Sequence, residues 1–414
     1  MKVVSLSKAP KDSSSAQSKK TLKQRELTHS LAFMFALALA FFGSFAQAQS
    51  LTVLYEFTGS PDGAGSYARL VQDSTGNLYG TTPIGGTNNG TVFEISSQEN
   101  ETLLQTFKGK RNGFFPGAGL VIDDNGRLYG TTVYGGAHNL GTVFKLNKAG
   151  TKTVLYNFSG PDGANPWSDL VRDAAGNLYG TTTAGGSGNC NDGSGCGTVF
   201  MISANGTETV LHSFAGGPAD GQTPFAGLLR DAFGNLFGTT YAGGTAGFGT
   251  VFEVSGTGTE TILHNFAGDP TDGLHPQAVL VRDAAGNLYG TTVEGGAHGY
   301  GTVFKLSKTG KEKLLYSFGS GADGKNPSAG LVRDRAGNLY GTTMAGGGTG
   351  CNGNGCGTVF ELTKTGVEKV LYSFDTEDQG AVPFAALILD ATGNLYGTTS
   401  NGGAGYGTVF KITP

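Results

Sequence analysis

The stretch Gly176–Thr182 reads G-N-L-Y-G-T-T, and the sequence contains seven variants of it. They begin at Gly76, Gly126, Gly176, Gly234, Gly286, Gly337 and Gly393. Successive copies are 50, 50, 58, 52, 51 and 56 residues apart, and G-T-V-F follows each copy after a glycine-rich interval. Such a period, with strand-forming content, predicts one supersecondary unit repeated around an axis or along a solenoid.

Each unit is predicted to contain four antiparallel strands, A to D, because its apolar runs are β-branched or aromatic and are bounded by Gly, Asn and Asp. In the third unit we expect them at Leu170–Asp173, Asn177–Thr182, Thr198–Ile202 and Thr209–Phe214. Seven such units predict an all-β fold, a seven-bladed β-propeller of four-stranded blades. An open β-solenoid is the alternative, but it would need atypical capping units, which the sequence lacks.

The two ends of the array complement each other. Residues 51–57 (L-T-V-L-Y-E-F) form a strand D with no A, B or C before it, and residues 407–413 (G-T-V-F-K-I-T) form a strand C with no D after it. We expect the N-terminal strand to complete the last blade, which closes the ring and removes exposed strand edges. Residues 49–414 are therefore predicted to be a single propeller domain.

Residues 1–48 lie outside the array and resemble a signal peptide. Basic residues between positions 19 and 25 precede a run of 15 mostly apolar residues at 31–45 and an A-Q-A sequence ending at Ala48. Cleavage after Ala48 is predicted. An uncleaved anchor is the alternative, although a spanning helix needs about 20 apolar residues. We expect an exported protein, periplasmic or extracellular, with no membrane association after cleavage.

The net charge of the chain excludes one class of binding partner. Without residues 1–48 the chain has 21 basic and 30 acidic side chains, a net charge of −9, so the basic footprint of a nucleic-acid binder is missing. We expect a monomer that binds no nucleic acid.

The four cysteines form two local pairs, Cys190/Cys196 and Cys351/Cys356, and we expect two disulfides in an exported chain. A shared metal site is the alternative, but the pairs lack C-x-x-C spacing and are 155 residues apart.

The repeated block resembles the GloVer-type tandem repeat of exported bacterial proteins with a choice of surface anchors. The resemblance covers residues 51–414 and rests on seven G-N-L-Y-G-T-T…G-G…G-T-V-F matches. It implies an exported or surface protein and brings no established activity. This chain ends at Pro414 without a hydrophobic tail or sorting motif, so we expect it to be soluble after export. The double glycine after strand B gives a weaker, kelch-like resemblance.

Residues that recur in all seven units are predicted to hold the blades together. An Asp three residues before the heptapeptide glycine can accept backbone N–H bonds in a turn; these are Asp73, Asp123, Asp173, Asp231, Asp283, Asp334 and Asp390. The G-T-V-F phenylalanines are expected in the core between blades: Phe93, Phe144, Phe200, Phe252, Phe304, Phe360 and Phe410. Central glycines such as Gly80 are expected to permit close approach near the axis.

The histidines and known motifs indicate no chemistry. His212 and His264 occupy the strand D position that holds tyrosine in other units, and we expect them to be packed substitutes. There is no zinc spacing, G-x-S-x-G elbow, phosphate loop or calcium loop. We therefore expect no cofactor, no metal and no catalytic residues.

Non-recurrent residues gather on one expected face, because the variable D–A and B–C connections emerge on the same side of a blade. Three residues before the strand A leucine, the units carry Tyr67, Gly117, Trp167, Phe225, Gln277, Ser328 and Phe384. We interpret Tyr67, Trp167, Phe225 and Phe384 as ligand platforms. Arg69, Asp169, Tyr134, Tyr241 and Glu294 add non-recurrent chemistry. Alternatively, the aromatic rings only roof the core.

Three functions fit these observations. The first is a non-catalytic exported module that binds extracellular glycan or a protein. The second is a rigid structural protein of an envelope or matrix. The third is a carbohydrate-active enzyme, which needs two carboxylates roughly 5–10 Å apart; Asp169 and Glu294 are the candidates, but they lie two blades apart. We favour the first, because the non-recurrent residues do not assemble into a catalytic set.

Overall fold

The computed structural model describes Met1 and residues 49–190, 193–268, 270–319 and 322–413. Gln49–Thr413 form one compact unit. Apart from Met1, the predicted signal peptide, residues 1–48, lies outside the described residues. Within those residues, no helix has the length and apolar character needed to cross a membrane.

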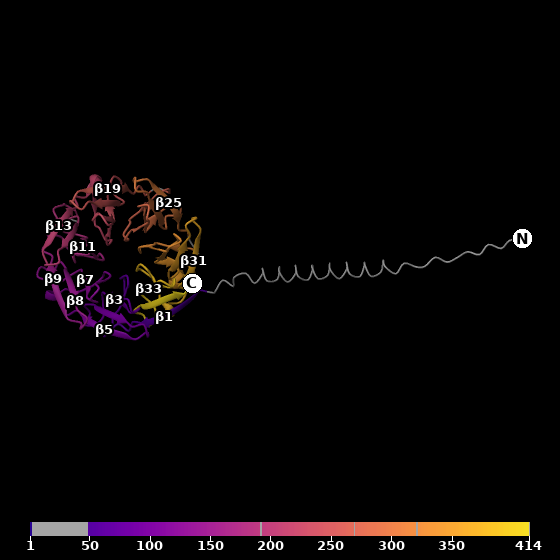
Figure 1. Cartoon of the computed structure of the whole chain (residues 1–414), viewed down its shortest axis with the longest axis horizontal. Helices are drawn as coiled ribbons and strands as arrows, with labels where there is room; N and C mark the ends of the chain where they lie inside the picture. Colours follow the sequence, from indigo (N-terminus) through magenta and orange to yellow (C-terminus); the bar gives the residue numbers. More distant parts are fainter. Residues whose placement is uncertain (2–48, 191–192, 269, 320–321, 414) are drawn as a thin grey trace. The chain divides into compact units, whose positions relative to one another are not determined.

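The compact unit is a seven-bladed β-propeller, which confirms the predicted fold (Figure 1). In each blade the four strands pair in sequence order, antiparallel, except in the blade that contains both chain ends. Blade 1 contains β2 (Val71–Gln72), β3 (Leu78–Thr82), β4 (Thr91–Ile95) and β5 (Glu101–Thr106). Blade 2 contains β6 (Val121–Ile122), β7 (Leu128–Thr132), β8 (Thr142–Leu146) and β9 (Lys152–Asn157). Blade 3 contains β10 (Val171–Arg172), β11 (Leu178–Thr182), β12 (Thr198–Ile202) and β13 (Glu208–Ser213). Blade 4 contains β15 (Leu229–Arg230), β16 (Leu236–Thr240), β18 (Thr250–Val254) and β19 (Glu260–Asn265), and blade 5 contains β21 (Val281–Arg282), β22 (Leu288–Thr292), β24 (Thr302–Leu306) and β25 (Glu312–Ser317). Blade 6 contains β27 (Val332–Arg333), β28 (Leu339–Thr343), β30 (Thr358–Leu362) and β31 (Glu368–Ser373). Blade 7 contains β32 (Ile388–Leu389), β33 (Leu395–Thr399), β34 (Thr408–Thr413) and β1 (Ser50–Glu56).

The last blade is closed by the N-terminal strand, as predicted. Its sheet order is β1-β34-β33-β32, and β1 pairs antiparallel with β34 from Ser50–Thr413 to Glu56–Thr408. Phe57, which follows β1, is fully buried, and its ring centroid lies 5.0 Å from that of Phe93 in blade 1. The first strand therefore joins the last blade to the first, and the ring has no free strand edge at this junction.

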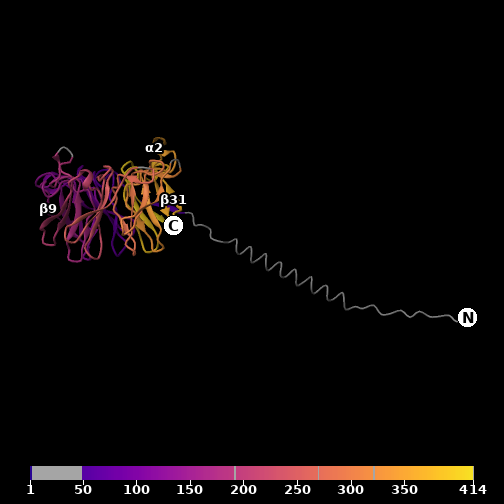
Figure 2. The same ribbon diagram turned by 90° about the horizontal axis from the view of Figure 1, so that it is seen from above.

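The connections contain short elements. Two-stranded ladders pair the D–A with the B–C connection in three blades: β14 (Gly221–Gln222) with β17 (Ala242–Gly243), β20 (Gly273–Leu274) with β23 (Glu294–Gly295), and β26 (Gly324–Lys325) with β29 (Ala345–Gly346). Among the described residues, the short helices of the connections are η1 (Lys110–Asn112), η3 (Gly217–Ala219), α2 (Gly350–Gly353) and η4 (Glu377–Gln379). In Figure 2, α2 lies at one face of the ring of blades.

The recurrent aspartates hold the A–B turns, as predicted. In blade 3, Asp173 Oδ1 accepts the Asn177 backbone N–H at 2.8 Å, and Oδ2 accepts the Tyr179 hydroxyl at 3.0 Å. Burial opposes ionisation of Asp173, but the hydrogen bonds from Asn177 and Tyr179 outweigh it and lower the pKa of this carboxyl. Asn177 belongs to the turn and not to strand B, because its carbonyl accepts the Asp173 N–H.

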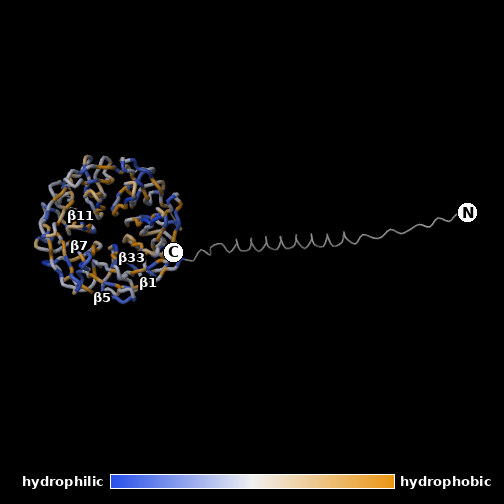
Figure 3. The backbone as a smooth tube through the Cα atoms, viewed as in Figure 1, coloured by the Kyte–Doolittle hydropathy of each residue, from blue (hydrophilic) through white to orange (hydrophobic). Residues whose placement is uncertain are grey.

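The core is repeated between every pair of neighbouring blades. The G-T-V-F phenylalanines are buried with at most 1% exposure, as predicted. Each packs edge-to-face on a phenylalanine that follows strand D of the preceding blade, with centroids 5.0–5.4 Å apart. Figure 3 accordingly shows hydrophobic stretches all around the ring. Edge-to-face pairs add about 0.5–1.5 kcal/mol each to the burial of their surface.

Threonines of strand B link the blades with hydrogen bonds. The Thr81 hydroxyl donates to the Ala118 carbonyl of the next blade at 2.9 Å, and Thr398 donates across the ring closure to Ala68 at 3.4 Å. The glycine before these threonines admits an aromatic ring, since a Cβ on Gly80 would lie 2.5 Å from the Phe93 ring. The close contact is thus with the paired strand of the same blade, and not with the ring axis as we expected.

Candidate functional site

The variable connections share one face, as the strand order predicted. In all seven blades a residue of the D–A connection pairs with a residue of the following B–C connection, either in the three short ladders or as isolated bridges such as Ala64–Ile84 and Phe114–Tyr134. Both disulfides lie in B–C connections of this face, Cys190–Cys196 in blade 3 and Cys351–Cys356 in blade 6. The two predicted pairings are therefore confirmed.

A cavity of about 470 Å³ opens on this face. Its wall is built from one structural position taken seven times, three residues before the first leucine of strand A: Tyr67, Gly117, Trp167, Phe225, Gln277, Ser328 and Phe384. The repeat places this position at the same height in every blade, so side chains about 50 residues apart in sequence converge. Binding cavities for small ligands typically occupy roughly 300–1,000 Å³.

The aromatic side chains of the wall are half-buried, unlike the phenylalanines of the core. The Tyr67 and Phe384 rings meet edge-to-face at 5.4 Å. The Trp167 indole meets Phe115 at 5.3 Å, and it covers Gly117, where a Cβ would lie 2.9 Å from the indole. These contacts fix the rings in position while part of each remains accessible from the cavity.

An ion pair crosses the floor of the cavity. Arg69 Nε lies 3.5 Å from Asp169 Oδ2, and Asp169 Oδ1 accepts the Gly119 N–H at 2.6 Å. The arginine side chain is 40% exposed and the aspartate 19%. The pair links blades 1 and 3 over Gly119 of blade 2, where a Cβ would lie 2.9 Å from the carboxylate. A half-exposed pair of this kind is worth about 0–1 kcal/mol, so Arg69 could exchange its partner for an anionic ligand at little cost.

The same ion pair separates two spaces along the ring axis. Arg69, Asp169, Val279, Gly330 and Ala386 line both the first cavity and a second one of about 470 Å³. The second cavity is otherwise lined by strand A residues, by the leucines that precede strand A and by Asp123 and Asp124 of an A–B turn. These five residues therefore form the boundary between the two cavities, where the Arg69–Asp169 pair faces small and apolar side chains.

Three of the nine predicted site residues lie outside the cavity wall. Tyr134 packs on Phe115 at 5.9 Å, and Tyr241 stacks on His275 at 4.4 Å with the rings 10° from parallel. Glu294, half exposed, lies 3.7 Å from His275. Glu294 therefore does not face Asp169 across the cavity. The other six residues, Tyr67, Arg69, Trp167, Asp169, Phe225 and Phe384, are brought together around one space.

Two residues were not predicted from the sequence: Phe115, which lines the cavity, and His275, which contacts Tyr241 and Glu294 outside it. Each precedes a loop proline and has a positive φ, 61° and 58°, a conformation uncommon for bulky residues. The position also holds Asn165, Thr223, Asn326 and Val382, all with positive φ. The His275 N–H donates to the Phe248 carbonyl of the preceding B–C connection. The variable residue before a recurring proline was the signal in the sequence.

A second set of recurrent acids, also missed, lies between the blades. The D–A connections contain a D-G dipeptide at Asp62, Asp162, Asp220, Asp272 and Asp323, and the strand D that faces each one begins with Glu101, Glu208, Glu260, Glu312 or Glu368. Oε1 of each of these glutamates is buried without a hydrogen-bond partner in the described part of the chain. Burial, and then the neighbouring aspartate, raise the pKa of Glu208 and Glu368 to about 7.

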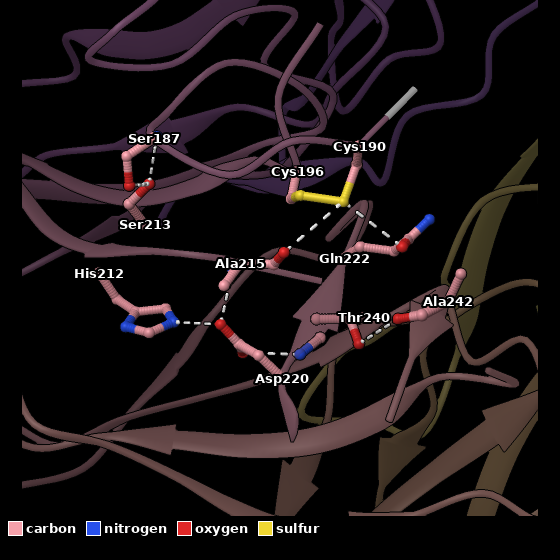
Figure 4. Close-up of a disulfide and its surroundings, with 11 residues drawn as sticks. Ser187, Cys190, Cys196, His212, Ser213, Ala215, Asp220, Gln222, Thr240 and Ala242 are labelled. Carbon is pink, nitrogen blue, oxygen red and sulfur yellow. Dashed lines mark hydrogen bonds and ion pairs between the residues drawn. A yellow bond between two sulfur atoms is a disulfide. The ribbon is translucent and has the colours of Figure 1, made fainter. Parts of the chain in front are cut away.

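His212 and His264 do replace tyrosine at the strand D position, but they are more than packed substitutes. Each Nε2 lies beside a carboxylate of this second set, at 3.4 Å from Asp220 Oδ2 and 3.3 Å from Asp272 Oδ2 (Figure 4 for His212). At three of the tyrosine-bearing junctions the hydroxyl donates to the aspartate instead, as Tyr316 does to Asp323 at 3.0 Å.

These features define the class: a seven-bladed β-propeller whose loop-bearing face opens on an aromatic-lined cavity with an ion pair at its floor. The sequence belongs to the Gloeobacter/Verrucomicrobia repeat family, whose repeat matches residues 41–191, 87–283 and 256–414. No curated protein sequence matches the chain.

Solved structures share the fold at low sequence identity. The extracellular domain of a protein described as a one-component system of B. thetaiotaomicron is 13% identical, with a TM-score of 0.56, over 88% of this chain and 40% of that one. PorZ, a surface component of the type-IX secretion system of Porphyromonas gingivalis, is 15% identical with a TM-score of 0.52, over 86% and 48%. A protein described as a 6-phosphogluconolactonase from Bacteroides uniformis is 16% identical with a TM-score of 0.52, over 78% and 89%. The chain thus spans less than half of the first two proteins.

Proposed function

We propose that this protein is an exported binding propeller that holds a sugar unit of an extracellular glycan in the aromatic-lined cavity. The observation that carries the proposal is the convergence of Tyr67, Trp167, Phe225 and Phe384 with Arg69 around one space of about 470 Å³. A pyranose ring has an apolar face of C–H groups and an edge of hydroxyls. Half-buried aromatic rings suit the face, and the charged pair suits the edge.

The arrangement of charges favours binding over hydrolysis. Among the described residues that line the cavity, Asp169 supplies the carboxylate, and it is already engaged by Arg69 and the Gly119 N–H. Glycoside hydrolysis typically uses two carboxyl groups that flank the scissile bond. Glu294, the second candidate, is paired with His275 away from the cavity.

Export to the periplasm or the cell exterior is part of the proposal. It is supported by the basic and apolar pattern of residues 1–48 and by two disulfides, which persist in oxidising compartments. Two structures with the same fold are an extracellular domain and a surface component of their own organisms. We propose that the protein acts as a monomer, because the closed ring presents its variable loops on one face.

The test is a glycan-array screen followed by a fluorescence titration, since Trp167 is the single tryptophan. We expect a glycan that changes Trp167 emission on binding and that binds roughly tenfold more weakly to Trp167→Ala, because an aromatic contact is worth about 0.5–1.5 kcal/mol beyond its buried area. Phe233→Ala is the matched control, since Phe233 is 86% exposed in an A–B turn outside the cavity. The proposal fails if no glycan binds, or if Trp167→Ala binds as tightly as Phe233→Ala.

A further inference from the structure

Three potential metal ligands converge at the junction of blades 3 and 4, away from the cavity. His212 lies on β13, Asp220 follows η3 in the D–A connection, and Glu260 begins β19 of the next blade. A ring nitrogen of His212 and one carboxylate oxygen from each acid all lie within 4.8 Å of one another. Figure 4 shows the imidazole pointing toward Asp220.

Two of these three atoms are buried and lack a hydrogen-bond partner. His212 Nε2 and Glu260 Oε1 are both shielded from solvent, and neither makes a hydrogen bond within the described part of the chain. Asp220 is fixed in place, because its oxygens accept the Ala215 and Gly221 N–H groups at 2.7 and 2.6 Å. A carboxylate retains further lone pairs after two such bonds. A buried polar atom without a partner is costly, and at this junction a bound metal ion would satisfy both His212 Nε2 and Glu260 Oε1.

Other junctions share the unpartnered glutamate oxygen but differ in the group beside the aspartate. At the junction before blade 6, the Tyr316 hydroxyl donates to Asp323, while Glu368 Oε1 has no hydrogen-bond partner among the described residues. At the junction of blades 1 and 2, the equivalent of Glu260 is Lys152, whose ammonium group donates to the Asn112 carbonyl and lies 4.6 Å from the Phe107 ring. A cation therefore fits at this position of the fold. At the His212 junction the described residues instead place an imidazole and two carboxylates together.

We propose that His212 Nε2, Asp220 and Glu260 bind a divalent transition-metal ion of the zinc type between blades 3 and 4, with water completing the coordination. Imidazole with carboxylates is a donor set suited to such ions. Ligand distances of about 2.0–2.2 Å place the donor atoms of a tetrahedral site roughly 3.3 Å apart, which the His212–Asp220 distance of 3.4 Å already matches. The donor atoms lie within 4.8 Å of one another, so Glu260 has to move by up to about 1.5 Å to reach this spacing. The ion would join strand D of one blade to strand D of the next.

The experiment is a zinc titration of the full chain, freed of metal with a chelator, by isothermal titration calorimetry and thermal melting. We expect about one zinc per chain with a rise in melting temperature, and the loss of both in His212→Tyr. Tyrosine holds this position at other junctions, in Tyr156 and Tyr316, so the variant should keep the fold, which circular dichroism checks. His298→Ala, at an exposed loop histidine, is the matched control and should bind zinc like the unmodified chain.

Glu260→Gln provides a second measurement, because it removes an anionic ligand and keeps the shape of the side chain. We expect zinc affinity to fall about tenfold or more, and the visible absorption of bound Co²⁺ to change in this variant and in His212→Tyr. The assignment is overturned if the unmodified chain binds no zinc at micromolar concentrations or if folded His212→Tyr still binds one equivalent. Loss of zinc only in His264→Tyr, at the neighbouring junction with Asp272, also overturns it.

Discussion

The closure of the ring by β1 can be tested by removing that strand and returning it as a peptide. The strand pairs with β34 at six positions, and Phe57 after it is fully buried against Phe93. A chain that begins at Gly59 therefore loses an outer strand of blade 7 and one of the inter-blade phenylalanine pairs. It also exposes the edge of β34 to solvent.

The expected loss follows from these contacts. Truncation of a buried phenylalanine costs about 3–5 kcal/mol. The ladder hydrogen bonds contribute roughly 1 kcal/mol each, but ordering each residue of the strand costs about 1–2 kcal/mol of backbone entropy, so these two contributions largely offset each other. We therefore expect a loss of about 3–5 kcal/mol. In a domain of several hundred residues, each kcal/mol shifts the melting temperature by about 2 °C, which gives a fall of roughly 6–10 °C.

The assay is thermal melting, followed by circular dichroism, of chains that begin at Gln49 and at Gly59. A synthetic peptide of residues 49–58, added in excess, should bind the exposed edge of β34 and restore most of the lost stability. The same peptide with Phe57→Ala is the control and should restore little, because it lacks the side chain that contacts Phe93. If the Gly59 chain melts within about 2 °C of the Gln49 chain, the reasoning about closure is wrong.

Two further predictions concern the loops and the acids between blades. Replacing both Cys190 and Cys196 by serine should lower the free energy of unfolding by about 2 kcal/mol, the chain-entropy value for so short a loop. Scanning calorimetry measures this loss, and an unchanged stability would argue against a stabilising role of the disulfide. Burial and the neighbouring Asp162 raise the pKa of Glu208 from its ordinary value of 4.5 to about 7. The folded state therefore binds more protons than the unfolded state between these values, and stability falls as pH rises through this window. Glu208→Gln should remove that part of the pH dependence and stabilise the protein above neutral pH. The expected gain is on the order of 1 kcal/mol, because the group is only partly buried. Urea melts at several pH values measure the free energy of unfolding, and a variant whose pH profile runs parallel to that of the unmodified chain would contradict the assignment.

Much of the fold could be predicted from local patterns. Strand C of the third unit was predicted at Thr198–Ile202, and β12 has those bounds. Strand D was predicted one residue late, and strand A proved shorter than predicted, at Val171–Arg172. Strand A is short because only two of its residues pair with β11 before the Asp173 turn begins. The pattern of apolar residues and turn residues indicates where a strand lies, whereas its ends depend on which backbone groups find partners.

The candidate site was predictable where the repeat itself fixes position. The ring of residues three before the strand A leucine converges because sevenfold repetition places one sequence position at one height in every blade. Tyr134, Tyr241 and Glu294 also follow strand B directly, at or next to a position that pairs in every blade, but the repeat does not show which side chains of the D–A connection they meet. Their side chains contact residues of the D–A connection, such as Phe115 and His275. The type of residue at that position differs from blade to blade.

The sequence by itself determined the seven units, their four strands, the closing strand and the two disulfides, because hydrophobic periodicity, turn residues and short spacings are encoded locally. Only the tertiary structure decided which side chains meet between blades: Arg69 with Asp169 over Gly119 of blade 2, and His212 with Asp220 and Glu260 at the junction of blades 3 and 4. Those distances follow from the angle and spacing at which packed blades close into a ring. No segment of sequence encodes that geometry, because it results from the packing of all seven blades together.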